Sequence, residues 1–233
     1  LFEKHLQWSP YNYVLRNPFV LIDPDGRQID VIGGTKEERE EFLETLGIEG
    51  LTFEAKGSNK VVYNGGNKDK NETVKFILDL IQGKITSYKD NPNGAPVILN
   101  CEIKENSYFW ENGEIIFFPA EGYGGNLYDK TDNKVIGRQY FHLPSINKMD
   151  AYNIYDEQDL LRHAITEGGK GAQYRLIYDD AHKIASELKM GPLFDRVERI
   201  ATLKKYMLRY YYRKNNDGNK YETIFDYENI KEK

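Results

Sequence analysis

The sequence predicts an α+β fold in a single domain, with a mixed region of helices and antiparallel strands followed by a helical C-terminal half. Short apolar and aromatic runs, separated by turn residues, recur through the first two thirds of the chain. From about residue 156, apolar side chains instead recur at helical spacing. Because strands come first and helices last, the pattern favours α+β over a sheet in which the two alternate.

Composition narrows the class of protein. The chain has 233 residues, of which 39% are hydrophobic and 30% charged, as expected for a folded globular domain. No stretch approaches the roughly 20 apolar residues that a transmembrane helix needs. The net charge of −5 argues against nucleic acid as a partner held by the whole surface. The single cysteine, Cys101, excludes an internal disulfide, and we expect it to be a buried core residue of a strand.

Local signals set the elements of the N-terminal half. A strand over 28–32 ends at two glycines. Thr35 and Glu38 then have the spacing of a capping box, which begins a helix that Gly47 ends. Apolar side chains at helical spacing predict a second helix over 72–82. Further strands are expected over 51–55, 60–63 and 97–103.

Turn residues organise the rest of the chain. Asn112-Gly113 predicts a hairpin between strands over 107–110 and 114–118. A glycine-rich loop is expected over 121–126, with a strand near Val135. Three helices, separated by a glycine run and by a Gly-Pro pair, are then expected over 156–166, 174–189 and 191–214.

The first 27 residues are a different kind of sequence, punctuated by prolines that prevent a continuous helix. The order SPYNYV at 9–14, NP at 17–18 and IDPDGR at 22–27 resembles the closing segment of the Rhs/YD-repeat core. In that family the segment ends a large secreted shell, and a variable toxin domain follows it. The resemblance implies that residues 1–27 are a remnant of the core end and that residues 28–233 are the toxin domain.

The same resemblance implies a biological setting. It predicts an antibacterial or anti-host toxin, secreted or delivered into a target cell, with a target-cell macromolecule as its substrate. It also predicts a cognate immunity protein as a partner that blocks the toxin. The N-terminus of this sequence lacks a basic segment followed by an apolar one, so we expect no signal peptide here.

The candidate site combines two histidines with carboxylates at helical spacing. His163 and Glu167 share one helix face, and Asp179 and His182 share a face of the next helix. If the two helices meet antiparallel through a connection at 168–171, these four side chains come together. We expect His163, Glu167 and His182 to be catalytic, with His163, Asp179 and His182 as metal ligands.

Three interpretations of this cluster stay open. Two imidazoles and a carboxylate suit a divalent transition metal such as zinc. The same residue types suit general acid–base catalysis without a metal, because the pKa of a histidine beside a carboxylate lies near neutrality. A purely structural role is the third interpretation. A hydrolase, either metal-dependent or metal-free, is the function we expect.

A second resemblance concerns residues 156–193. The order of LLRHA, a glycine, YDDAH and MGPL is similar to that in effector-type zinc metallopeptidase toxin domains. In those domains the first helix carries an H-E-x-x-H motif. Here Asp159 and Leu160 stand where the first histidine and the catalytic glutamate belong. The resemblance therefore implies a shared helical scaffold and does not support the standard reaction, because the general base is missing.

Other functions remain as alternatives. An NAD-using transferase would draw on four residues: Arg138, Tyr140, His142 and Glu167. A nuclease would use the basic, tyrosine-rich helix expected over 195–214, although the same helix suits a solvated amphipathic role. A toxin that acts only by binding, or an inactive metallopeptidase-like domain, is the non-catalytic alternative.

Overall fold

The computed structural model describes residues 29–89, 92–106, 108–111, 114–117, 123–131, 134–151, 155–186, 196–201, 207–214 and 221–228. The segment that resembles the Rhs core end, and the domain boundary expected after it, lie outside these residues. Within them, no helix is long and apolar enough to span a membrane.

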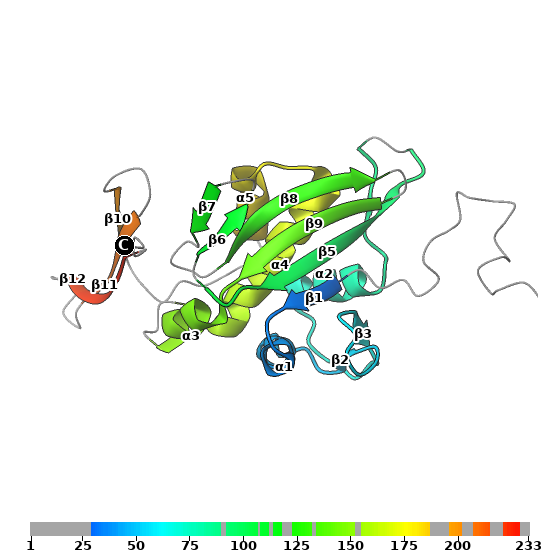
Figure 1. Ribbon diagram of the computed structural model, residues 1–233, viewed down its shortest axis with the longest axis horizontal. Coiled ribbons are helices and arrows are strands. Elements are labelled where there is room, and N and C mark those ends of the chain that lie inside the picture. Colours follow the sequence, from blue (N-terminus) through cyan, green and yellow to red (C-terminus); the bar gives the residue numbers. More distant parts are fainter. Residues whose placement is uncertain are drawn as a thin grey trace, which may run out of the picture.

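A mixed sheet forms the centre of the molecule (Figure 1). Its strand order is β1-β5-β9-β8, and the short β4 pairs with β5. Both β1 and β9 run parallel to β5, whereas β8 and β4 pair antiparallel with their neighbours. The strands are β1 (Ile29–Gly33), β4 (Thr86–Ser87), β5 (Ala95–Ile103), β8 (Tyr123–Thr131) and β9 (Lys134–Phe141). The α+β class is confirmed, but the expected purely antiparallel pairing is not found.

Parallel neighbouring strands need a crossover connection between them. The long segment between β1 and β5 provides this connection. This connection contains α1 (Lys36–Thr45), β2 (Leu51–Phe53), β3 (Val61–Tyr63) and α2 (Glu72–Ile81). The predicted capping box is confirmed. The backbone N–H of Glu38 donates to the Thr35 hydroxyl at 3.1 Å, and the Thr35 N–H donates to the Glu38 carboxylate at 2.7 Å.

The predicted hairpin is also confirmed, as β6 (Tyr108–Glu111) and β7 (Glu114–Phe117). The loop expected over 121–126 is wrong, because β8 already begins at Tyr123. The glycines at 124 and 125 lie within the strand. Gly125 has a φ of +147° beside an irregularity in register, and a Cβ there would lie 2.4 Å from the carbonyl oxygen of Arg138. Only glycine fits this close approach of two strands.

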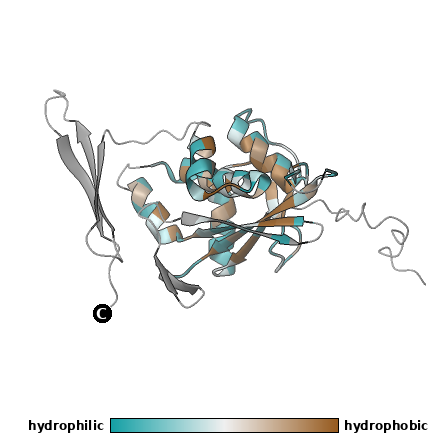
Figure 2. Ribbon diagram, turned by 90° about the horizontal axis from the view of Figure 1, so that it is seen from above, coloured by the Kyte–Doolittle hydropathy of each residue, from teal (hydrophilic) through white to brown (hydrophobic). Residues whose placement is uncertain are grey.

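Three helices follow the sheet: α3 (Leu143–Ala151), α4 (Glu157–Tyr174) and α5 (Tyr178–Ser186). Helix α4 packs across β5, β9 and β8 and also contacts α2. Figure 2 shows hydrophobic stretches along the strands and along the helices that lie against them. Side chains on β5 alternate between buried and half-buried, so one face of the strand forms the core beneath α4.

The helix break expected at 168–171 is wrong, since α4 continues to Tyr174. Its glycines allow close packing rather than end the helix. A Cβ on Gly168 would lie 3.0 Å from Cδ1 of Leu99, and one on Gly169 would lie 2.9 Å from the ring of Phe76. The helix ends at Arg175, which adopts the left-handed conformation with φ of +53°.

The helix expected over 191–214 is wrong. The described residues there form β10 (Arg196–Ala201) and β11 (Met207–Lys214), and β12 (Tyr221–Glu228) completes an antiparallel sheet. Aromatic and β-branched residues such as the run Tyr210–Tyr212 favour extended structure when a partner strand is present. The helical part of the C-terminal half is therefore confined, among the described residues, to 143–186.

Candidate functional site

Two neighbouring helices hold the predicted site residues. His163 and Glu167 lie one turn apart on the buried side of α4, and His182 lies on α5. The left-handed Arg175 reverses the chain after α4, so that α5 packs back against it. The structure thus brings the three side chains together through the turn after Tyr174, rather than through the glycine run.

The three side chains converge on one point. Nδ1 of His182 lies 2.7 Å from Oε2 of Glu167. Nε2 of His163 lies 3.4 Å from the same carboxylate oxygen and 3.3 Å from Nδ1 of His182. One carboxylate oxygen therefore faces a nitrogen of each imidazole, and the rings meet edge to face with centroids 5.0 Å apart.

Burial differs sharply within the cluster. Glu167 is 0% exposed and His163 is 3% exposed, whereas 40% of the His182 side chain is exposed. A buried carboxylate is costly unless polar partners compensate it, and here the two imidazoles do so. The exposed part of His182 is the side from which solvent reaches the cluster.

The pKa of Glu167 reflects two opposing effects. Burial raises the pKa. The hydrogen bonds from His163 and His182, together with the charges of these imidazoles, lower the pKa by a larger amount. The pKa therefore lies below the ordinary value for glutamate, and the carboxylate is ionised near neutral pH. An ionised glutamate between two imidazoles is both a strong hydrogen-bond acceptor and a suitable metal ligand.

The spacing of the three atoms fits a metal ion. Ligands about 2.0–2.1 Å from a tetrahedral zinc lie about 3.4 Å from one another. The distances of 3.3 and 3.4 Å that involve Nε2 of His163 match this value. The 2.7 Å contact between His182 and Glu167 is a hydrogen-bond length, so a metal would have to widen it by several tenths of an ångström. All three ligand atoms lie within 4.8 Å of one another.

Other predicted residues are not part of the cluster. Asp179 is exposed on the first turn of α5 and lies outside the group that a metal would join. Gly137 and Gln139 of β9 face α4. Arg138 and Tyr140 alternate with them along the strand, so they point to the other side of the sheet.

His142 lies beyond the end of β9, where its Nδ1 is 2.7 Å from the Ser145 hydroxyl at the start of α3. The residues considered for a transferase are thus not brought together with Glu167. Cys101 is fully buried, as expected, and burial raises the pKa of its thiol.

Sequence reasoning missed two residues that shape the site. Tyr178 stacks on His182, with ring centroids 5.6 Å apart and planes 17° from parallel. Their i,i+4 spacing on α5 was a signal that could have revealed this contact. Arg162 is buried and donates from Nε to the carbonyl oxygen of Leu46 at 2.9 Å, which ties α4 to the end of α1. No local signal predicts that bond, since the partners are 116 residues apart.

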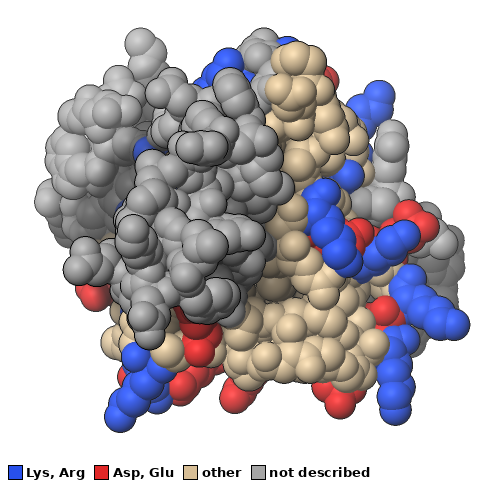
Figure 3. Space-filling view, turned by 90° about the vertical axis from the view of Figure 1, so that its right-hand side faces the viewer, with Lys and Arg blue, Asp and Glu red and all other residues tan. Residues whose placement is uncertain are grey.

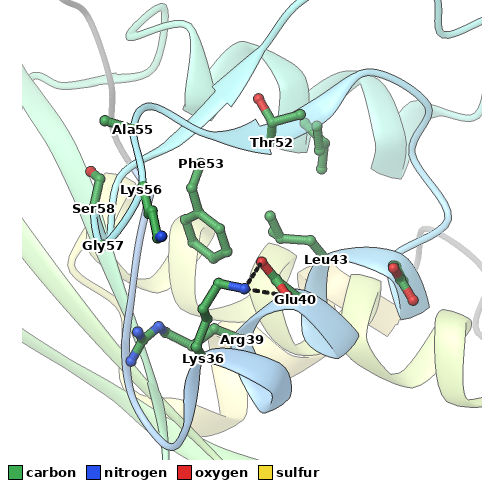
Figure 4. Close-up of a pocket in the computed structure, with 12 residues that line it drawn as sticks. Lys36, Arg39, Glu40, Leu43, Thr52, Phe53, Ala55, Lys56, Gly57 and Ser58 are labelled. Atoms are coloured by element: carbon green, nitrogen blue, oxygen red, sulfur yellow. Dashed lines mark hydrogen bonds and ion pairs between the residues drawn. The ribbon is translucent and has the colours of Figure 1, made fainter.

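A separate groove of about 530 Å³ lies between α1 and the β2–β3 hairpin (Figure 4). Phe53 and Leu43 line its apolar part, and the ion pair of Lys36 with Glu40, at 3.0 Å, spans one side. The groove contains no histidine and is not part of the cluster on α4 and α5.

Comparison with known protein families, with curated proteins and with solved structures finds no match for this chain. Its chemistry therefore follows from the residues themselves. A buried His–Glu–His cluster with one exposed imidazole can bind a divalent transition metal or pass a proton between solvent and a held substrate.

Proposed function

We propose that this chain carries the toxin domain of an Rhs-type secreted protein, and that the domain is a hydrolase with its active site at His163, Glu167 and His182. The metal-capable arrangement of these three side chains is the observation that carries the enzymatic part. The resemblance of residues 8–27 to the end of the Rhs core supports the toxin part. The partner expected in that setting is a cognate immunity protein, and the substrate is a macromolecule of the target cell.

The preferred chemistry uses a divalent transition metal such as zinc. Two histidines and one glutamate form a ligand set found at catalytic zinc sites, where a further position remains for water. When bound, such a metal lowers the pKa of its water and supplies a nucleophile at neutral pH. The partial exposure of His182 leaves a side from which a substrate can approach.

The 2.7 Å contact between Glu167 and His182 favours a second candidate, which is metal-free acid–base catalysis. A carboxylate that accepts a hydrogen bond from Nδ1 orients the imidazole and fixes its tautomer. Nε2 of His182 would then exchange a proton with a substrate. Both candidates need the same three residues, and they differ in whether a metal is bound.

Viable counts after induced expression of the full chain in a susceptible bacterium test the proposal. We expect the parent chain to kill, and His163→Ala and Glu167→Gln to lose killing at equal protein level. Asp179→Asn is the matched control, because Asp179 is an exposed carboxylate on the same pair of helices. Metal content of the purified chains, measured by inductively coupled plasma mass spectrometry, should be one ion per chain for the parent and the Asp179→Asn control only.

Each result decides between the candidates. Killing that survives both His163→Ala and Glu167→Gln would show that the active site lies elsewhere. Killing that is lost in both His163→Ala and Glu167→Gln, in a parent chain that binds no transition metal, would favour acid–base catalysis. Loss of metal from Asp179→Asn would mean that Asp179 is a metal ligand, as the sequence predicts. The three residues that the structure brings together would then not be the complete metal site.

A further inference from the structure

The turn between α4 and α5 is surrounded by exposed aromatic side chains. The Arg175 carbonyl oxygen in this turn accepts hydrogen bonds from the Tyr128 hydroxyl at 3.2 Å and from Nζ of Lys89 at 3.5 Å. Three segments far apart in the sequence therefore meet at this point. Among the residues whose side-chain burial the structure describes, the exposed large hydrophobic side chains all belong to these segments: Tyr88, Tyr128, Tyr174, Ile177 and Tyr178. We call these five residues the tyrosine surface.

The tyrosine surface borders the candidate site. Tyr178 is its member nearest the cluster, because its ring stacks on that of His182. Tyr174 lies one turn before it in the chain, at the end of α4. A ligand that lay along the tyrosines would thus end beside the one exposed imidazole of the cluster.

Cations accompany these aromatic rings. Nζ of Lys89 donates to the Arg175 carbonyl oxygen, and Nζ of Lys170 is 5.6 Å from the centre of the Tyr174 ring. Lys130 lies two residues after Tyr128 on the same face of β8, and Lys183 follows His182. The described acids on α5 beside them are Asp179 and Asp180. Lysines therefore accompany the exposed rings, in a chain whose net charge is −5.

Figure 3 looks onto the end of the sheet that lies to the right in Figure 1. Lys and Arg side chains project from this end, with acidic side chains interspersed toward its margins. The positive charge is thus distributed rather than gathered in one patch.

We propose that the tyrosine surface binds a single-stranded polynucleotide and presents one of its phosphodiesters to the cluster at His182. Exposed aromatic rings with cations between them suit unpaired bases and a phosphate backbone. A duplex hides its base faces within the stack, so it would leave the tyrosines without a stacking partner. The inference rests on the proposed hydrolase function. The net charge of the chain gives no indication of such a binding surface, because it counts charges without regard to where they lie in the structure.

The reaction is hydrolysis and needs no further reactant. The oxygen of a water molecule forms a bond to phosphorus, and the bond from phosphorus to one nucleoside oxygen breaks. The hydroxyl group stays on the phosphate, and the other proton of the water ends on the departing oxygen.

Binding is tested first with the metal-free full chain carrying His163→Ala, so that neither candidate chemistry cleaves the probe. Fluorescence anisotropy with labelled single-stranded RNA and DNA of about 15 nucleotides, and with a duplex of the same sequence, measures the affinity for each. We expect single strands to bind more tightly than the duplex, with affinity that falls as salt is raised. Labelled chitin and peptidoglycan oligosaccharides are the competing ligands, since sugars also stack on tyrosine.

Two matched pairs of variants locate the surface. Tyr174→Ala should weaken single-strand binding about 5- to 150-fold, whereas Tyr174→Phe, which keeps the ring at the same position, should restore it. Lys89→Ala should weaken binding and reduce its salt dependence. Lys56→Ala, in the groove at α1, should do neither because that lysine lies outside the tyrosine surface.

The proposal is overturned by three results. These are no binding of any polynucleotide at low salt, equal loss in the Lys89 and Lys56 variants, or preferred binding of an oligosaccharide. Its failure is separable from failure of the hydrolase proposal. His163→Ala should bind single strands as the parent does but cleave none, so binding and hydrolysis are scored by different variants.

Discussion

Nδ1 of His182 lies 2.7 Å from Oε2 of Glu167, although the two residues are on different helices and 15 positions apart in the chain. This contact joins a fully buried carboxylate to the most exposed imidazole of the cluster. It links the buried side of α4 to the exposed side of α5. The pH dependence of stability should report on it directly.

We expect Glu167→Gln to change how stability depends on pH. The pKa of Glu167 in the folded chain lies below its ordinary value of 4.5, so the ionised carboxylate stabilises the fold above that pH. The stabilisation is lost as the pH falls through the lowered pKa. The difference in free energy of unfolding between parent and variant should shrink as the pH falls below about 4.5.

Urea unfolding of the metal-free chains at a series of pH values measures this difference. Asp180→Asn is the control, because it removes an exposed carboxylate from α5. A difference that grows as the pH falls below about 4.5 would mean that the carboxylate of Glu167 is disfavoured in the folded state.

Gly168→Ala should destabilise the protein, contrary to the usual effect in a helix. Alanine normally favours a helix over glycine by about 1 kcal/mol. Here the new Cβ would meet Cδ1 of Leu99 at 3.0 Å, and we expect a net loss of about 1–3 kcal/mol. The penalty should be smaller in a Leu99→Val background, which lacks that atom. Equal penalties in both backgrounds, measured by urea unfolding, would show that Leu99 is not the cause.

Arg162→Met should destabilise the fold by about 2–3 kcal/mol. The guanidinium donates to the carbonyl oxygens of Leu46 and Gly47 at 2.9 and 3.1 Å, and its loss leaves these acceptors without that donor. Arg39→Met is the control, since Arg39 makes similar bonds to Gly33 and Gly34 closer to the surface. We expect about 1 kcal/mol for the control. A reversed order in urea unfolding would mean that Arg162 does not join α4 to α1.

Cys101 should react with thiol reagents only when the chain unfolds. It is fully buried in β5, and burial raises the pKa of its thiol, so both access and thiolate are lacking. The rate with Ellman's reagent should therefore follow the rate of global unfolding and rise in urea. Rapid reaction in native buffer would show that β5 opens locally or that the thiol faces solvent.

Short-range features of the fold were predictable from sequence. The capping box of Thr35 and Glu38, the helix at Glu72–Ile81 and the hairpin around residues 112–113 depend on residues within a few positions of one another. The pairing of His163 with Glu167 belongs to the same class, because an i,i+4 spacing places both on one helix face. In each case the interacting groups are neighbours in the chain, so the local pattern specifies them.

Tertiary structure alone decided the rest. In the local pattern, the glycines at 168–169 predict a helix break. In the structure the helix continues through them, and the space beside them is filled by Leu99 and Phe76 from distant elements. The apolar side chains over 197–207 have a helical spacing, and yet Arg196–Ala201 and Met207–Lys214 form strands, because β10 pairs with β11 and β11 pairs with β12. Strand pairing and close packing depend on partners that a local window does not contain.

The candidate site divides along the same line. The sequence by itself determined which residue types were available and that His163 and Glu167 share a face. Only the tertiary structure decided that Glu167, rather than Asp179, joins the two histidines, and that Tyr178 stacks on His182. The reason is physical: the direction in which α5 leaves Arg175, and its packing against α4, set which of its side chains reach the buried carboxylate.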